Sequence, residues 1–235
     1  MDETEAIGKI SALLFKEKRY EEWAFLNRIL YKSAKTNYDK YTYLGYEYIA
    51  MEKLHDLHRG RVVLQKIVKM APLGKRYYCE GYFIKLSQIE YAAGKKKTAL
   101  KILNDGILLS YKYKDGELDL LETLFGLFSE KELKSRMPLY EKVIKQVIRN
   151  WNLSIPEPRG ILLTYENIKK LRQEAFDCYC QMNKVLSKAN IYMKKNEHQK
   201  AIKLIEEYQK DYAVPCLNRY LVYLKKNWSK SEVSF

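Results

Sequence analysis

The sequence is poor in residues that cross-link or interrupt a chain. Among 235 residues it has four cysteines, five prolines and three histidines. Four cysteines in a chain of this length do not predict a disulfide framework, and the acidic start at residues 1–5 does not resemble a secretory signal. No apolar run reaches the roughly 18–20 residues of a membrane span. We therefore expect a cytoplasmic protein that does not enter a membrane.

Residue patterns that carry catalysis or bind metals are also missing. The sequence contains no Gly-rich phosphate loop, no nucleophile elbow, and neither HExxH nor paired CxxC spacing. His55 and His58 are three residues apart, but they fall at a predicted turn without acidic or cysteine neighbours in a cluster. Cys178 and Cys180 would point to different faces of a helix. We predict no enzymatic activity, no metal site and no cofactor.

Acidic residues are outnumbered. Lys and Arg total 43 against 29 Asp and Glu, which gives a net charge of +14. The excess is concentrated in residues 31–76 and 181–235. Such charge steers acidic proteins, peptides or nucleic acids toward a surface, so we expect a partner of acidic character. A solvated, lysine-rich surface accounts for the same numbers, and both interpretations stay open.

Helical periodicity is present almost throughout. Apolar and small residues recur at i, i+3, i+4 and i+7, as from Ala201 to Tyr208, whereas alternation at strand spacing is nearly absent. The sequence predicts an all-α protein, with helices at about 3–16, 19–33, 37–54, 58–71, 75–93, 95–110, 116–128, 136–150, 161–195, 197–212 and 214–227.

Two segments of the chain repeat each other. Residues 86–103 and 188–205 both contain a helix, a turn, and a second helix with a small residue five positions after the turn. These small residues, Ala99 and Ala201, are 102 positions apart, which is three times 34. A period of about 34 residues is typical of a helix–turn–helix repeat unit.

The chain resembles the tetratricopeptide repeat superfamily at these two places. Phe83 and Leu86 stand at the family's Trp and Leu positions, and Tyr192 stands at its Tyr position. Looser units occur around Trp23, which replaces the small residue, and over residues 44–72, where we expect a lengthened turn between the helices.

The resemblance implies a right-handed α-solenoid of stacked antiparallel helix pairs with a concave groove. We expect one repeat domain over residues 1–226 with an irregular section at about 114–180, followed by a tail at 227–235. The proline-containing segment from Trp151 to Gly160 is the predicted break in the stacking.

The resemblance also implies a binding surface in that groove. In the family, a groove asparagine commonly pairs with a peptide backbone, and Asn190 stands at that position, with Gln88 as a longer equivalent. An amide offers both a donor and an acceptor, and a nearby lysine can hold a carboxylate or phosphate. The predicted partner-binding residues are Lys85, Gln88, Tyr91, Asn190, Met193 and Lys194.

Tyrosine is unusually frequent, with 21 residues against 7 Phe. A tyrosine combines apolar area with a hydroxyl, which suits recognition surfaces. Tyrosines that fill contacts between helices explain the same abundance, and the sequence does not separate these uses.

The resulting hypothesis is a non-catalytic helical-repeat module, regulatory or scaffolding, that binds a peptide or protein in its groove. Its Lys-, Tyr- and Ile-rich composition is similar to that of helical-repeat peptide receptors of Gram-positive bacteria and their phages. One alternative is a structural subunit of a larger assembly. The other is a nucleic-acid-binding repeat protein in which Tyr77 and Tyr78 stack on bases beside a phosphate track. That track would consist of Lys53, Arg59, Arg61, Lys66, Lys69, Lys75 and Arg76.

Overall fold

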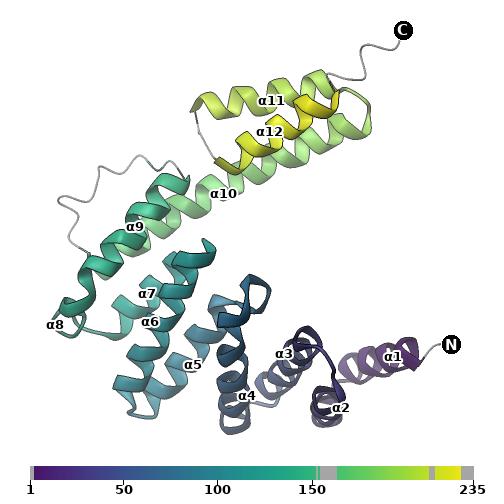
Figure 1. The fold of residues 1–235 in the computed structure, drawn as a ribbon, viewed down its shortest axis with the longest axis vertical. Helices are drawn as coiled ribbons and strands as arrows, with labels where there is room; N and C mark the ends of the chain where they lie inside the picture. Colours follow the sequence, from purple (N-terminus) through teal and green to yellow (C-terminus); the bar gives the residue numbers. More distant parts are fainter. Residues whose placement is uncertain (1–2, 152, 154–162, 212–214, 229–235) are drawn as a thin grey trace. The chain divides into compact units, whose positions relative to one another are not determined.

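The computed structural model describes residues 3–151, 153, 163–211 and 215–228. These residues are helical, with turns and short connections and no strand, as the sequence predicts (Figure 1). None of the described helices has the length and apolarity needed to cross a bilayer. The α-helices are α1 (Glu3–Lys16), α2 (Tyr20–Ser33), α3 (Asn37–Lys53), α4 (Leu57–Met70), α5 (Glu80–Ala92), α6 (Lys96–Tyr113), α7 (Glu117–Leu127), α8 (Glu130–Leu133), α9 (Met137–Trp151), α10 (Tyr165–Lys194), α11 (His198–Asp211) and α12 (Pro215–Trp228).

Three of the predicted helices differ from the structure by three or more residues at one end. The helix expected at 161–195 begins only at Tyr165, after the extended residue Thr164. The helix expected at 75–93 begins only at Glu80, because Tyr78 and Cys79 are extended after a 3-10 turn at Lys75–Tyr77. The helix expected at 95–110 continues to Tyr113 and ends at Lys114, which has a φ of 57°. The short helix α8 was not predicted.

The chain divides into two compact units, Met1–Leu127 and Phe128–Phe235, called unit 1 and unit 2 below. The boundary falls inside the section at 114–180 that departs from the repeat pattern. Residues 154–162, which hold most of the predicted break in the stacking, lie outside the described residues, as do residues 229–235 of the predicted tail.

The same turn closes four helix pairs, α1–α2, α3–α4, α5–α6 and α10–α11. In each, the residue two positions beyond the first helix has a φ between 56° and 75°. The N–H of the following residue donates to the carbonyl five positions earlier, at 2.9 Å in all four turns. This bond belongs to the Schellman arrangement, which satisfies carbonyls left open at a helix C-terminus. The four residues of positive φ are Lys18, His55, Gly94 and Asn196.

The lengthened turn predicted within residues 44–72 is therefore wrong. The turn from Lys53 to Leu57 has the same length and hydrogen bonds as the other three. Its left-handed residue is His55. The helix boundaries predicted the place of this turn, but not its likeness to the other three, because glycine and asparagine are the usual residues in this conformation.

Equivalent positions after the four turns are buried. Five residues beyond the left-handed residue lie Trp23, Gly60, Ala99 and Ala201, and nine residues beyond it lie Asn27, Leu64, Leu103 and Ile205. All eight are buried, so the same two positions of each second helix face the interior. The side chain is small at three of the first four positions, which lets the paired helices approach closely.

In unit 1, alternate helices also lie next to one another. Each helix from α1 to α6 packs against the following one, and α5 also packs against α7. Tyr82 of α5 contacts the rings of Tyr41 and Tyr48 of α3. Arg59 of α4 pairs with Glu21 of α2, and Ile102 of α6 packs on the cluster that contains Leu64 of α4. We call α3, α5 and α7 the odd row, and α2, α4 and α6 the even row.

Unit 2 has its own core where α10, α11 and α12 pack together. Ala189 of α10, Ala201 and Ile205 of α11, and Leu217 and Leu224 of α12 are almost fully buried in it. Cys178 is buried in the same cluster, whereas Cys79 and Cys180 are half-buried free thiols. The side chain of Cys216 lies outside the described residues.

Candidate binding surface

Three of the predicted partner-binding residues lie on α5 in unit 1. Lys85 and Gln88 are exposed and Tyr91 is half-buried. The Nζ of Lys85 lies 3.3 Å from Oε1 of Glu52 on α3, and the same oxygen accepts a hydrogen bond from the Tyr48 hydroxyl at 3.4 Å. Lys85 is therefore already balanced by a carboxylate, which weakens its predicted role as an anion-binding group.

The amide of Gln88 is the part of this surface that is open to a partner. Gln88 is exposed, and among the described residues its amide makes no hydrogen bond. Tyr91 lies one turn further along α5, and the Nζ of Lys96 on α6 lies over its ring, 5.4 Å from the centroid. A partner backbone at Gln88 would thus meet an unpaired donor and acceptor beside an aromatic ring that a cation holds in place.

The other three predicted residues lie on α10 in unit 2. Asn190 and Lys194 are exposed, whereas Met193 is half-buried and packs against the unit 2 core. Oδ1 of Asn190 accepts a hydrogen bond from the Tyr220 hydroxyl of α12 at 3.4 Å. The acceptor of this amide is thus in use within the chain. Convergence of Gln88, Tyr91, Asn190 and Lys194 on one partner stays a prediction.

Glu52 is a residue of this surface that the sequence analysis missed. It lies three positions before His55, whereas Lys85 lies nine positions before Gly94, and the two are 33 residues apart. The two residues meet because α5 lies beside α3 in unit 1. No local signal in the sequence identifies the pair, because the two residues stand at different positions before their turns.

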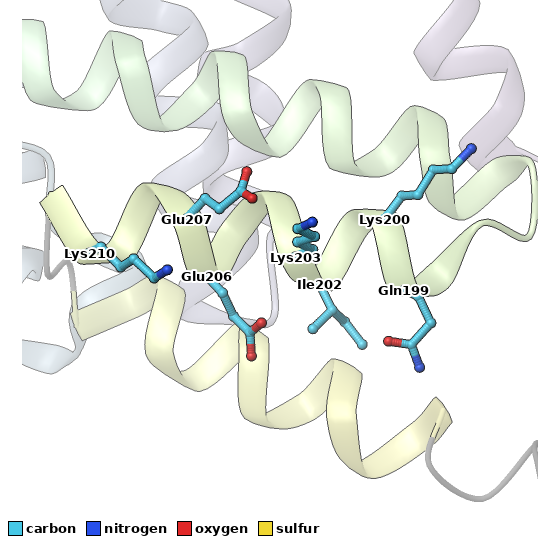
Figure 2. A pocket seen from close by; sticks show the side chains of 7 residues that line it. All are labelled: Gln199, Lys200, Ile202, Lys203, Glu206, Glu207 and Lys210. Carbon is cyan, nitrogen blue, oxygen red and sulfur yellow. The ribbon is translucent and has the colours of Figure 1, made fainter.

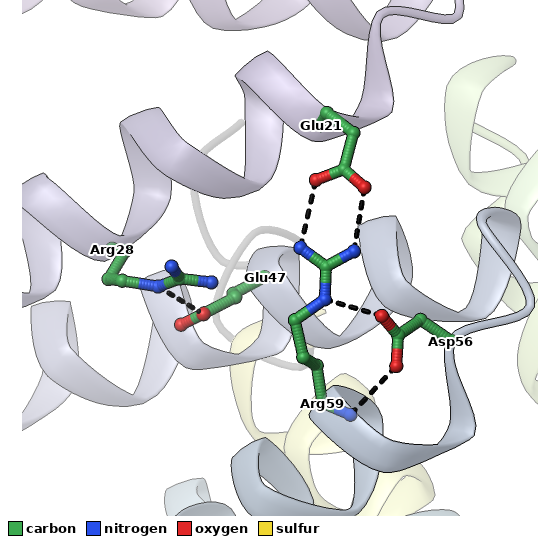
Figure 3. Close-up of polar contacts among 5 residues, drawn as sticks. All are labelled: Glu21, Arg28, Glu47, Asp56 and Arg59. Atoms are coloured by element: carbon green, nitrogen blue, oxygen red, sulfur yellow. Dashed lines mark hydrogen bonds and ion pairs between the residues drawn. The ribbon is translucent and has the colours of Figure 1, made fainter.

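The arginines of the predicted phosphate track are engaged inside unit 1. Arg59 donates two hydrogen bonds to Glu21, at 2.9 and 2.6 Å, and its Nε donates to Asp56 (Figure 3). Arg61 donates to both carboxylate oxygens of Glu90, at 2.6 and 3.0 Å. These bidentate pairs occupy guanidinium N–H groups that would otherwise donate hydrogen bonds to a phosphate.

The remaining residues of that track differ in their surroundings. Lys75 donates to the Tyr113 carbonyl at 3.1 Å, while Lys66 and Arg76 lie over the rings of Tyr31 and Tyr77. Lys53 and Lys69 are exposed and make no ion pair among the described residues. The track is therefore interrupted by internal contacts at most of its positions.

Tyrosines fill the contact between α3 and α5. The Tyr82 ring lies 5.7 Å from Tyr48 and 6.3 Å from Tyr41, centroid to centroid, both edge to face. Burial raises the pKa of Tyr48 to about 12 and also raises the pKa of Tyr82. Tyr77 and Tyr78 are buried as well, so these rings are not exposed for stacking on bases.

Charge is distributed unequally between the two rows of unit 1. The even row carries ten Lys and Arg against three acidic residues, a net +7. The odd row carries three lysines against eight acidic residues, a net −5. The positive charge of unit 1 therefore lies on the row opposite the predicted peptide surface.

Part of this acidic charge is buried against even-row arginines. Glu47 of α3 is 4% exposed and accepts a hydrogen bond from Arg28 of α2 at 2.8 Å (Figure 3). Glu90 of α5 is fully buried against Arg61 of α4, whose hydrogen bonds lower the pKa of that carboxyl. The arginines thus tie the two rows together, and the exposed charge of the even row comes from lysines.

Unit 2 has a hollow of about 480 Å³ along α11, lined by Gln199, Lys200, Ile202, Lys203, Glu206, Glu207 and Lys210. Figure 2 shows Gln199, Ile202 and Glu206 on the side toward α12. Glu206 pairs with Lys225 of α12 at 2.5 Å. The described lining residues all come from α11, and they form an open face of that helix.

Among the described residues, no three His, Cys, Asp or Glu side chains are grouped so as to hold a metal ion. His55 occupies the left-handed position of its turn and His58 is exposed in the first turn of α4. No protein-family model, curated protein or solved structure matches this chain.

Proposed function

We propose that the protein is a non-catalytic helical-repeat module that binds a peptide or protein partner. The observation that carries this proposal is the identical turn at Lys18, His55, Gly94 and Asn196, with buried residues at the same two positions after each. A chain that reuses one helix pair in this way presents rows of equivalent helix faces. We further propose that the pairs stack as a right-handed α-solenoid, and that the module has a regulatory or scaffolding role.

The binding surface proposed in unit 1 is the outer face of α5 beside α3. Gln88 supports it, because its exposed amide makes no hydrogen bond within the described residues. The neighbouring Lys85–Glu52 pair fixes the two helices side by side. The odd row is acidic. We therefore expect the partner at this surface to be selected by its shape and by hydrogen bonds to its backbone, and not by its net charge.

This proposal is tested by affinity capture from nuclease-treated extract of the source cell, with the full chain as bait. The wild type is compared with Gln88→Glu, which keeps the side-chain size but removes the donor. A matched control, Gln181→Glu, makes the same change at an exposed position of α10, outside this surface. Circular dichroism and a melting curve establish that all three baits are folded.

The expected result is at least one protein or peptide retained by the wild type and by Gln181→Glu but lost with Gln88→Glu. Its affinity for Gln88→Ala, measured by calorimetry, should fall roughly ten- to a hundredfold, the equivalent of about 1–3 kcal/mol for unpaired polar groups. The proposed surface would be overturned if the wild type and Gln88→Glu retained the same proteins and peptides, and if the affinity for Gln88→Ala were unchanged.

A further inference from the structure

The even row of unit 1 has a second exposed surface with its own chemistry. On α2, Phe25, Ile29 and Lys32 recur at helical spacing and are exposed. The outward positions of α4 are Val62, Lys66 and Lys69. On α6 they are Lys97, Lys101, Asp105, Leu108 and Lys112. Each of the three helices thus presents at least one large apolar side chain on the same face as lysines.

The exposed apolar groups on this face are substantial. Phe25 is 62% exposed, Ile29 47%, Val62 44% and Leu108 45%. Ile29, Val62 and Leu108 each have a lysine three or four positions further along the helix, and therefore one turn away on the same side, and Phe25 lies one turn before Ile29. Lysine stems contribute additional apolar area while their ammonium groups stay in water. The face is therefore amphipathic as well as basic.

The lysines are the available cations of this row. The arginines of α2 and α4 are held by Glu47, Glu21, Asp56 and Glu90. In contrast, Lys32, Lys69, Lys97 and Lys101 make no ion pair among the described residues. Charge complementarity therefore calls for carboxylates or phosphates on whatever covers the face.

We infer that the even-row face, formed by the outward residues of α2, α4 and α6, docks an acidic amphipathic segment of another protein. Carboxylates of the partner would meet the lysines, and its apolar side chains would cover Phe25, Ile29, Val62 and Leu108. This surface is separate from the one proposed on α5. It gives a role to the positive charge of unit 1, which lies on the even row and not on the odd row.

Nucleic acid and anionic membrane fit the face less well. Nucleic acid would use the arginine forks, which are occupied, and it would leave the apolar side chains uncovered. A bilayer would have to bury Asp105, which lies one turn from Lys101 and next to Leu108 on α6. A protein segment can place a donor opposite Asp105 while it covers the neighbouring apolar groups.

The test uses the full chain and a fluorescein-labelled helical peptide of 21 residues with leucines at i, i+3, i+4 and i+7 flanked by glutamates. A second peptide has alanine in place of every leucine. Binding is measured by fluorescence anisotropy over a range of salt concentrations. A 21-base-pair DNA duplex and phosphatidylserine vesicles serve as the competing anionic probes.

The charge-reversed variant is Lys69→Glu/Lys101→Glu, because neither lysine makes an internal ion pair. The matched control is Lys40→Glu/Lys53→Glu on α3, which makes the same change in net charge on the odd row. Melting curves show whether both variants are folded. If the even-row variant does not fold, Lys69→Gln/Lys101→Gln replaces it.

The leucine–glutamate peptide should bind the wild type and the control alike, and about tenfold more weakly to the even-row variant. The alanine peptide should bind the wild type about tenfold more weakly than the leucine peptide, because the apolar contacts are lost. The inference is overturned if the two variants lower affinity equally. It is also overturned if DNA or vesicles bind through Lys69 and Lys101 while the leucine–glutamate peptide does not.

Discussion

Arg61 of α4 holds the buried carboxylate of Glu90 on α5 with two hydrogen bonds, 2.6 Å from Nε and 3.0 Å from Nη2. Gln65 of α4 adds a third contact to the same carboxylate, at 3.2 Å. This arrangement joins the even row to the odd row. It also removes an arginine from the exposed charge of the chain, and so it bears on both proposed binding surfaces.

Replacing Glu90 with Gln should destabilise the fold. The Arg61 fork would lose its charged acceptor in a buried site, and we expect the free energy of unfolding at pH 7 to fall by about 1–3 kcal/mol. Urea denaturation followed by circular dichroism measures this. Glu52→Gln is the control. It alters the exposed ion pair between Lys85 and Glu52 and should change stability by less than about 0.5 kcal/mol.

The same pair predicts a pH dependence. Because Arg61 lowers the pKa of Glu90 in the folded state, the pair contributes stability above the unfolded pKa of about 4.3. This contribution is lost as the pH falls through the lower, folded pKa. Between pH 5 and pH 3 the wild type should therefore lose more stability than Glu90→Gln. Parallel losses would show that the pair does not titrate in this way.

Gly106 and Gly8 form a matched pair of helical glycines. A Cβ at Gly106 would lie 3.1 Å from Leu120 Cδ2 and from Phe83 Cβ, whereas at Gly8 it would meet nothing within 4 Å. Gly106→Ala should lower stability by about 1–3 kcal/mol through overpacking where α5, α6 and α7 meet. Gly8→Ala should instead raise stability by up to about 1 kcal/mol. Thermal melts compare the two, and equal shifts would contradict the close approach.

The shared turn predicts the effect of glycine at its left-handed position. His55→Gly and Lys18→Gly remove the steric cost of a Cβ at positive φ, and each should raise stability by up to about 1 kcal/mol. Asn196→Gly should gain less, because asparagine tolerates this conformation. Lys101→Gly, at an exposed position inside α6, should lose about 1 kcal/mol. A loss at His55 as large as at Lys101 would rule out the turn geometry.

Buried tyrosines predict behaviour at high pH. The pKa of Tyr48 is raised by burial to about 12, and the pKa values of Tyr41, Tyr78 and Tyr82 are raised for the same reason. The unfolded chain ionises near pH 10, so the folded state should lose stability as the pH rises from 10 to 12. A spectrophotometric titration at about 295 nm should show one group of tyrosines ionising near pH 10 and another only on unfolding.

Local signals in the sequence were sufficient for the helices and for two of the shared turns. Periodicity of apolar residues depends on a single helix, and Gly94 and Asn196 are residues that favour the left-handed conformation. Burial of Ala99 and Ala201 followed from the same repeat spacing. The turn at His55 was predicted in place but with the wrong length, because histidine gives no such signal, although its backbone follows the same path.

What the sequence by itself determined, then, is that the chain is helical, where most helices begin and end, and which small residues separate paired helices. Only the tertiary structure decided that Lys85 faces Glu52, that Arg61 faces Glu90, and that positive charge gathers on one row of unit 1. Helix formation depends on residues within a few positions of each other. Ion pairs and charged faces depend on which helices become neighbours, and side chains about 30 residues apart meet only after the helix pairs have packed.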